Sequence, residues 1–140
     1  MGVTITAINS SYSFDMGCGG FFNLRRNIAL ALDKDFGENY ALIAKCQTDE
    51  QYAENDKAAE LIIANKHLDD EYRDVLDFLY TPDEDGEISY KTCRKIYELI
   101  KDVDFGGKCF RYAAHVHNDY EEFKMFLKEC VSYKRNMRWY

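Results

Sequence analysis

A glycine-rich segment between residues 15 and 20 is the first place where the residue types could bind a ligand. It reads Asp15-Met16-Gly17-Cys18-Gly19-Gly20, and the flanking pattern puts it between a strand and a helix. Glycines let a backbone approach a ligand closely, and the free amides at the start of a helix favour anions. Two arginines about one turn further on would add positive charge. The candidate ligand-binding residues are Asp15, Gly17, Gly19, Gly20, Arg25 and Arg26.

This segment matches neither the dinucleotide-binding fingerprint nor the P-loop, since no Gly-Lys-Ser or Gly-Lys-Thr follows. It therefore indicates, at most, a phosphate or nucleotide site on the Gly17–Gly20 loop. The alternative is a connection whose glycines only help the chain to reverse direction.

Residues 83–89 resemble the middle of an EF-hand calcium loop. With Gly86 at the sixth position of the loop, Asp83 and Asp85 stand at the third and fifth positions. Threonines, Thr81 and Thr92, occupy the places of the first acidic ligand and of the closing glutamate. Without those two carboxylates we expect a polar turn and no metal site.

Two histidines, His115 and His117, would share one face of a strand, as metal ligands sometimes do. No acidic or cysteine partner at helix spacing accompanies them, and the five cysteines contain no CxxC pair. We therefore predict no metal, no cofactor and no catalytic residue. The odd number of cysteines and the absence of a signal-peptide pattern at the opening residues favour reduced thiols in a cytoplasmic protein.

Negative charge is concentrated between residues 49 and 90, which hold 14 acidic and three basic residues of a chain with net charge −7 and pI near 4.9. This excess argues against direct nucleic-acid binding and predicts a protein partner with a basic surface. The alternative is a solvated helix face. The spacing of Asp70, Asp74 and Asp77 predicts one acidic stripe along a helix. The candidate partner-binding residues are Asp70, Asp74, Asp77, Asp83, Glu84 and Asp85.

The hydrophobic pattern predicts that the candidate residues lie in a single α+β domain, 1–140. This domain is expected to be mainly α, with about five to six helices packed on a small two-stranded β element. Residues 3–7 alternate as a strand does, and residues 9–20 are expected to be irregular. A second strand is favoured over residues 108–116, although a helix stays open there. A first helix is expected over residues 21–33, and Phe36-Gly37 is expected to separate it from a short helix over 38–46. Further helices are expected over 49–65, over 69–81, from Ser89 and from about residue 118, and Tyr52 is expected to point inward from the helix over 49–65.

The longest apolar run has five residues, Ile28 to Leu32, so no membrane-spanning segment is predicted. The closing Asn136–Tyr140 contains the only tryptophan, which is costly to expose. We expect this tail to pack back on the domain or on another subunit, as in a homodimer.

Both ends of the chain resemble a group of small uncharacterised proteins of bacteria and of their phages and mobile elements. The similarity lies in Val3-Thr4-Ile5-Thr6, in Asp15-Met16-Gly17-x-Gly19-Gly20-Phe21 and in Asn136-Met137-Arg138-Trp139, and it covers the whole chain. The group has no established activity, so the resemblance transfers no functional residue. It implies an accessory protein of a phage or mobile element.

The leading hypothesis is a non-enzymatic acidic interaction protein, an inhibitor of the anti-defence or immunity kind that binds a basic protein surface. The second is a protein that binds or sequesters a small anionic ligand, a nucleotide or phosphate, on the Gly17–Gly20 loop. An enzyme with a cysteine or histidine centre is the least supported.

Overall fold

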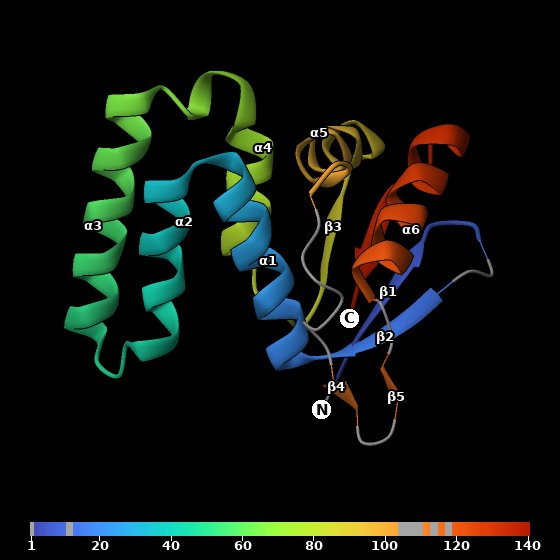
Figure 1. Cartoon of the computed structure of the whole chain (residues 1–140), viewed down its shortest axis with the longest axis horizontal. Helices are drawn as coiled ribbons and strands as arrows, with labels where there is room; N and C mark the ends of the chain where they lie inside the picture. The colour runs from blue at the N-terminus through green and yellow to red at the C-terminus, as the bar shows by residue number, and fades with distance from the viewer. Residues whose placement is uncertain (1, 11–12, 104–110, 113–114, 117–118) are drawn as a thin grey trace.

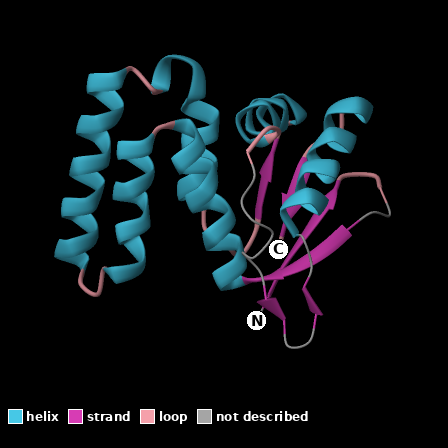
Figure 2. Cartoon of the chain, in the orientation of Figure 1, coloured by secondary structure: helices cyan, strands magenta, loops and turns pink. Residues whose placement is uncertain are grey.

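The computed structural model describes residues 2–10, 13–103, 111–112, 115–116 and 119–140 (Figure 1). This part of the chain is α+β and mainly α, as predicted (Figure 2). The strands are β1 (Gly2–Ala7), β2 (Ser13–Gly17), β3 (Gly86–Ile88), β4 (Arg111–Tyr112), β5 (His115–Val116) and β6 (Met137–Trp139). The helices are α1 (Cys18–Leu32), α2 (Lys34–Ala41), the 3-10 helix η1 (Leu42–Lys45), α3 (Asp49–Lys66), α4 (Asp69–Tyr80), α5 (Tyr90–Ile100) and α6 (Asp119–Tyr133).

The main sheet has four antiparallel strands in the order β2-β1-β6-β3, so the prediction of a two-stranded β element is corrected to four strands. Strands β1 and β6 occupy the centre, where Ile5 lies opposite Trp139. One face carries buried apolar residues and the other carries Thr4, Thr6 and the exposed Arg138. Within the described part of the chain, the sheet is therefore covered on one face only, as antiparallel sheets often are.

Strand β2 corrects the prediction that residues 9–20 are irregular. Its residues do alternate, with Asp15 exposed and Met16 buried, and Thr4 Oγ1 donates a hydrogen bond to Asp15 Oδ1 (2.6 Å). The alternation is short and is flanked by serine, asparagine and glycine. The composition of this segment therefore does not indicate a strand, and the pairing of β2 with β1 is what stabilises it.

The strand expected over residues 108–116 is present only in part. Residues 111–112 and 115–116 form strands β4 and β5, which pair with each other in a separate two-stranded sheet. Residues 108–110, 113–114 and His117 lie outside the described residues, as do the glycines 106–107.

Helices α1 and α2 meet at Asp33, and not at Phe36-Gly37 as predicted. Asp33 ends α1 and caps α2, where its carboxylate accepts a hydrogen bond from the Phe36 N–H (3.0 Å). Gly37 lies inside α2, and a Cβ added there would be 2.5 Å from Leu30 Cα. Glycine at this position lets the two helices pack closely; it does not break them.

Helix α3 begins with a capping box at Thr48 and Gln51, and Tyr52 is exposed where it was expected to point inward. Helix α4 has no side-chain cap and carries non-helical angles at Tyr72 (φ −118°, ψ 20°). Ser89 caps α5, as predicted. Figure 1 shows α3 and α2 side by side at the end of the molecule away from the sheet.

The tail is built into the core of the domain, which confirms one of the two placements predicted for it. Trp139 is fully buried against Phe21 and Phe78, with ring centroids 6.0 and 5.3 Å away, and its Nε1–H donates to the Pro82 carbonyl (3.1 Å). Among the described helices, none combines the length and the apolar character needed to cross a bilayer.

Candidate functional site

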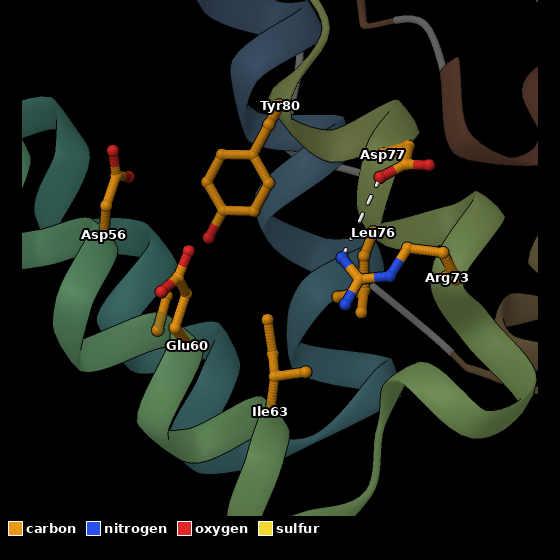
Figure 3. A pocket seen from close by; sticks show the side chains of 8 residues that line it. Asp56, Glu60, Ile63, Arg73, Leu76, Asp77 and Tyr80 are labelled. Carbon is orange, nitrogen blue, oxygen red and sulfur yellow. Dashed lines mark ion pairs between the residues drawn. The ribbon is translucent and has the colours of Figure 1, made fainter.

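A cleft of about 260 Å³ opens between α3 and α4 (Figure 3). We call it the α3–α4 cleft. Its lining combines an apolar floor with charged and aromatic groups at the rim. The lining residues are Asp56, Ala59, Glu60 and Ile63 from α3, and Arg73, Leu76, Asp77 and Tyr80 from α4.

The cleft exists because α3 is attached to the molecule mainly through α2. The side chains of Asn39 and Asn55 each donate to the other residue's backbone carbonyl (3.2 and 2.9 Å), and Lys66 pairs with Asp33 and Asp35 (3.0 and 2.6 Å). Helix α4 instead packs on α1 and α5. Because α3 packs on α2 whereas α4 packs on α1 and α5, the facing sides of α3 and α4 are not in close contact, and the cleft lies between them.

The floor of the cleft is apolar and the rim is acidic. Ala59, Ile63 and Leu76 are all buried. Asp56 and Glu60 are exposed one turn apart on α3, and among the described residues neither is within ion-pair distance of a cation. Two carboxylates therefore face the cleft without a cationic partner in the described part of the chain.

Across the cleft, Arg73 bridges two acidic residues of its own helix. Its Nη2 is 3.3 Å from Asp69 Oδ2, and its Nη1 is 3.9 Å from Asp77 Oδ1. Figure 3 shows the guanidinium lying between the helices, with the contact to Asp77 drawn as a dashed line. The chain itself thus places a guanidinium beside the acidic rim.

Tyr80 stands at the mouth of the cleft. Its ring makes edge contacts with Tyr40 and Phe36 (centroids 5.6 and 6.5 Å), and its hydroxyl points toward the Glu60 side of the cleft (Figure 3). Burial, then Tyr40 and the charge of Asp56, raise the pKa of the Tyr80 hydroxyl above its usual value. The hydroxyl stays neutral at all physiological pH values, so the ring offers an aromatic face and a hydrogen-bond donor.

The predicted acidic stripe is not continuous in the structure. Asp70 precedes the irregular residue Tyr72, while Asp77 lines the α3–α4 cleft. Asp74 between them is used inside the protein, where it accepts from Thr92 Oγ1 (2.7 Å) and from Lys95 Nζ (3.0 Å). Burial opposes the charge of Asp74, but these two donors outweigh it and lower the pKa of the carboxyl.

The turn that resembled an EF-hand carries two of its acids in ion pairs. Asp83 lies 3.4 Å from Arg25 and Asp85 lies 3.5 Å from Arg138, whereas Glu84 is exposed. Gly86 begins β3, and a Cβ there would overlap the Trp139 ring. No group of three or more potential metal ligands occurs among the described residues.

The glycine-rich segment is a junction between a strand and a helix, and the Arg25 guanidinium is directed to Thr81 and Asp83 instead of to this junction. Asp15 and Gly17 belong to β2, and Gly19 and Gly20 form the first turn of α1. Gly17 is the N-cap of α1 and makes no side-chain cap. A Cβ at Gly19 would meet nothing within 4 Å, so no close approach by a described residue explains this glycine.

Arg25, which was predicted to bind an anion with these glycines, is instead 4% exposed and lies among aromatic rings. Its guanidinium carbon is 4.2 Å from the Phe21 ring centre and 5.0 Å from that of Phe78. Nη1 donates to the Thr81 carbonyl (2.5 Å). Burial lowers the pKa of Arg25, and Tyr40 and Asp83 oppose that effect. Arg26 is half-buried.

Sequence reasoning missed the residues that make the cleft, Asp56, Glu60 and Tyr80. The spacing of Asp56 and Glu60, four residues apart, could have placed them on one helix face. Nothing in the sequence indicated that α4 would bring an aromatic ring opposite them. Comparison of the chain with protein-family models, with curated proteins and with solved structures finds no match.

Proposed function

We propose that the protein is a non-enzymatic interaction protein that binds a basic protein surface through α3 and the α3–α4 cleft. One observation carries this proposal: α3 has 18 residues, of which only Asn55, Ala59 and Ile63 are buried. Its exposed acidic residues make no ion pair with any described residue. They are Asp49, Glu50, Glu54, Asp56 and Glu60.

A helix that buries so little contributes little to the core, so its unpaired charges are available for recognition. Charge of one sign on a surface steers an oppositely charged partner and speeds association. An inhibitor of the anti-defence or immunity kind, acting in the cytoplasm on a basic protein, would use such a surface. The resemblance to small proteins of phages and mobile elements agrees with that role.

Binding of a nucleotide or phosphate at Gly17–Gly20 is the weaker alternative. The Arg25 guanidinium packs on Phe21 and donates to the Thr81 carbonyl, so it is not directed toward an anion that would bind at the Gly17–Gly20 junction. The α3–α4 cleft does not suit an anion either, because three carboxylates, those of Asp56, Glu60 and Asp77, line it.

The test is binding of a labelled oligolysine peptide, measured by fluorescence anisotropy over a range of salt concentrations. An α3 variant, Glu54→Gln with Asp56→Asn and Glu60→Gln, is compared with a control, Glu98→Gln with Asp102→Asn and Glu129→Gln. Both variants remove three negative charges from different places. In the control, Glu98 pairs with Lys101 (2.7 Å), whereas the α3 acids make no ion pair with any described residue.

We expect the α3 variant to lose about tenfold in affinity and most of its salt dependence, and the control to stay within about twofold of the original protein. Circular dichroism should show both variants folded, because surface substitutions usually change stability by only about 0.5 kcal/mol each. Equal losses in the two variants would mean that net charge alone matters, and the assignment to α3 would fail.

A further inference from the structure

We propose that the α3–α4 cleft receives one arginine side chain of the basic partner, and that Arg73 holds that place in the free protein. This inference rests on the proposed function and names the chemical group that the cleft selects. The occupant is a guanidinium; a lysine ammonium and a second copy of this chain are the alternatives that the test separates.

The size of the cleft suits a side chain. Pockets that enclose drug-sized ligands run from roughly 300 to 1,000 Å³. The α3–α4 cleft, at about 260 Å³, is below that range. It has room for the end of one long side chain presented by a partner surface, and too little for a nucleotide.

The lining suits a guanidinium better than an ammonium. Guanidinium is planar, weakly hydrated and able to stack on aromatic rings, whereas ammonium is compact and holds its water strongly. An apolar floor of Ala59, Ile63 and Leu76 penalises a strongly hydrated ion. The Tyr80 ring at the mouth offers the face that a guanidinium stacks on, within about 6 Å in such contacts.

The unpaired carboxylates of the rim complete the site. Asp56 and Glu60 are four residues apart on α3, so their Cβ atoms are roughly 5–6 Å apart on one face of the helix. Charge-assisted hydrogen bonds from a guanidinium to carboxylates are stronger than bonds between neutral groups. The two acids are thus placed to accept from the N–H groups of one entering arginine.

Arg73 already places one guanidinium at the cleft, where it pairs with Asp69 and Asp77 of its own helix and with neither Asp56 nor Glu60. Its side chain is 57% exposed and its pairs with Asp69 and Asp77 involve exposed carboxylates. Such surface pairs contribute only about 0–1 kcal/mol each. An arginine from a partner can therefore displace Arg73 from Asp77 at small cost, and removing Arg73 should leave the cleft open and more acidic.

The experiment compares labelled oligoarginine and oligolysine peptides of equal length, by anisotropy, on three proteins: the original chain, Arg73→Gln and Lys57→Gln. Lys57 is exposed on α3 and lies outside the lining of the cleft, so its substitution removes the same charge at a different place. We expect the original chain to prefer oligoarginine. We expect Arg73→Gln to raise oligoarginine affinity about three- to tenfold beyond the effect of Lys57→Gln.

A third variant, Tyr80→Leu, should reduce the preference for arginine while leaving oligolysine binding within about twofold. Equal binding of the two peptides, or equal effects of Arg73→Gln and Lys57→Gln, would overturn the arginine site and leave the proposed function standing. If peptide binding did not depend on the α3 acids at all, both the arginine site and the proposed function would fail. Concentration-dependent self-association that Asp56→Asn with Glu60→Gln weakens would assign the cleft to a second copy and also overturn the inference.

Discussion

Arg25 is a cation held in the core largely by aromatic rings. Its Nε and Nη2 are buried and have no hydrogen-bond partner among the described residues, while the faces of Phe21 and Phe78 lie within 5.0 Å of its guanidinium carbon. The attraction between the cation and the rings offsets part of the cost of removing the charge from water.

We predict that Arg25→Lys destabilises the protein more than Arg25→Met does. Lysine keeps the buried charge but loses the planar group that stacks on the rings and reaches the Thr81 carbonyl, whereas methionine removes the charge and fills similar space. Arg25→Lys should cost about 2–3 kcal/mol, measured by urea unfolding. A lysine variant as stable as the original protein would refute this account of Arg25.

Position 86 must be occupied by glycine because the Trp139 ring packs directly against its backbone. A Cβ at this position would overlap ring atoms of Trp139, and that ring is held by Phe78 and by its hydrogen bond to Pro82. We predict that Gly86→Ala lowers the unfolding free energy by about 1–3 kcal/mol, the usual cost of overpacking a core.

Gly19→Ala is the matched control, because a Cβ there meets nothing within 4 Å. Alanine is also the better helix former, so the control should be neutral or slightly stabilising. Both variants are compared by thermal and urea unfolding. Equal effects of the two substitutions would show that the contact with Trp139 does not decide the residue at 86.

Local sequence patterns could not show what Gly86 does. Its neighbours Asp83 and Asp85 suggested a failed calcium loop, because acids and a glycine at those spacings are what such loops contain. The true constraint is the Trp139 ring, which is distant in the sequence and is brought there by the pairing of β3 with β6.

At the scale of elements, the sequence predicted best where an apolar repeat ran long enough. Cys93, Ile96 and Ile100 recur at helical spacing and are buried on α5, whose predicted start at Ser89 the structure confirms. The strands β2, β3 and β6 were missed, because five, three and three residues are too few to show alternation clearly. The cleft was missed for a different reason: it depends on which neighbour holds each helix.

Asp74 connects two helices, since it lies on α4 and accepts from Thr92 and Lys95 of α5. Its pKa is lowered in the folded protein, so its contribution to stability is present above the ordinary aspartate pKa, about 3.9, and is lost as the pH falls through the lower folded value. The side chains of Lys95 and Asp74 are 42% and 35% exposed, so solvent screening reduces the contribution of this ion pair to stability.

We predict that Asp74→Asn costs about 1 kcal/mol near pH 7, and that the difference from the original protein shrinks once the pH is below about 4. Urea unfolding at several pH values measures it. A difference that stayed constant across this range would mean that the charge of Asp74 is not what joins α4 to α5.

At the scale of the whole molecule, the hydrophobic core needs no disulfide among the cysteines whose surroundings are described. Cys93 on α5 and Cys130 on α6 are fully buried free thiols, and Cys46 is a free thiol near the surface. A hydrogen bond with Cys130, together with burial, raises the pKa of the Cys93 thiol. Little thiolate forms there, so this thiol should react slowly.

We predict that the melting temperature is the same with and without a reducing agent, in scanning calorimetry on freshly purified protein. The core of Trp139, Phe21 and Phe78, with the helices around it, carries the stability instead. A clear drop in the melting temperature under reductant would show that a disulfide supports the fold.

The pairing of β1 with β6 has a consequence for the rate of folding. Thr4 and Tyr140 exchange both backbone hydrogen bonds (2.8 and 3.0 Å), so the middle of the sheet forms only when two segments far apart in the sequence meet. Closing so long a loop is entropically costly, and proteins rich in such contacts fold more slowly than helical bundles. Trp139 reaches its place between Phe21 and Phe78 only through that event. A chain dominated by helices should therefore refold at a rate set by its sheet.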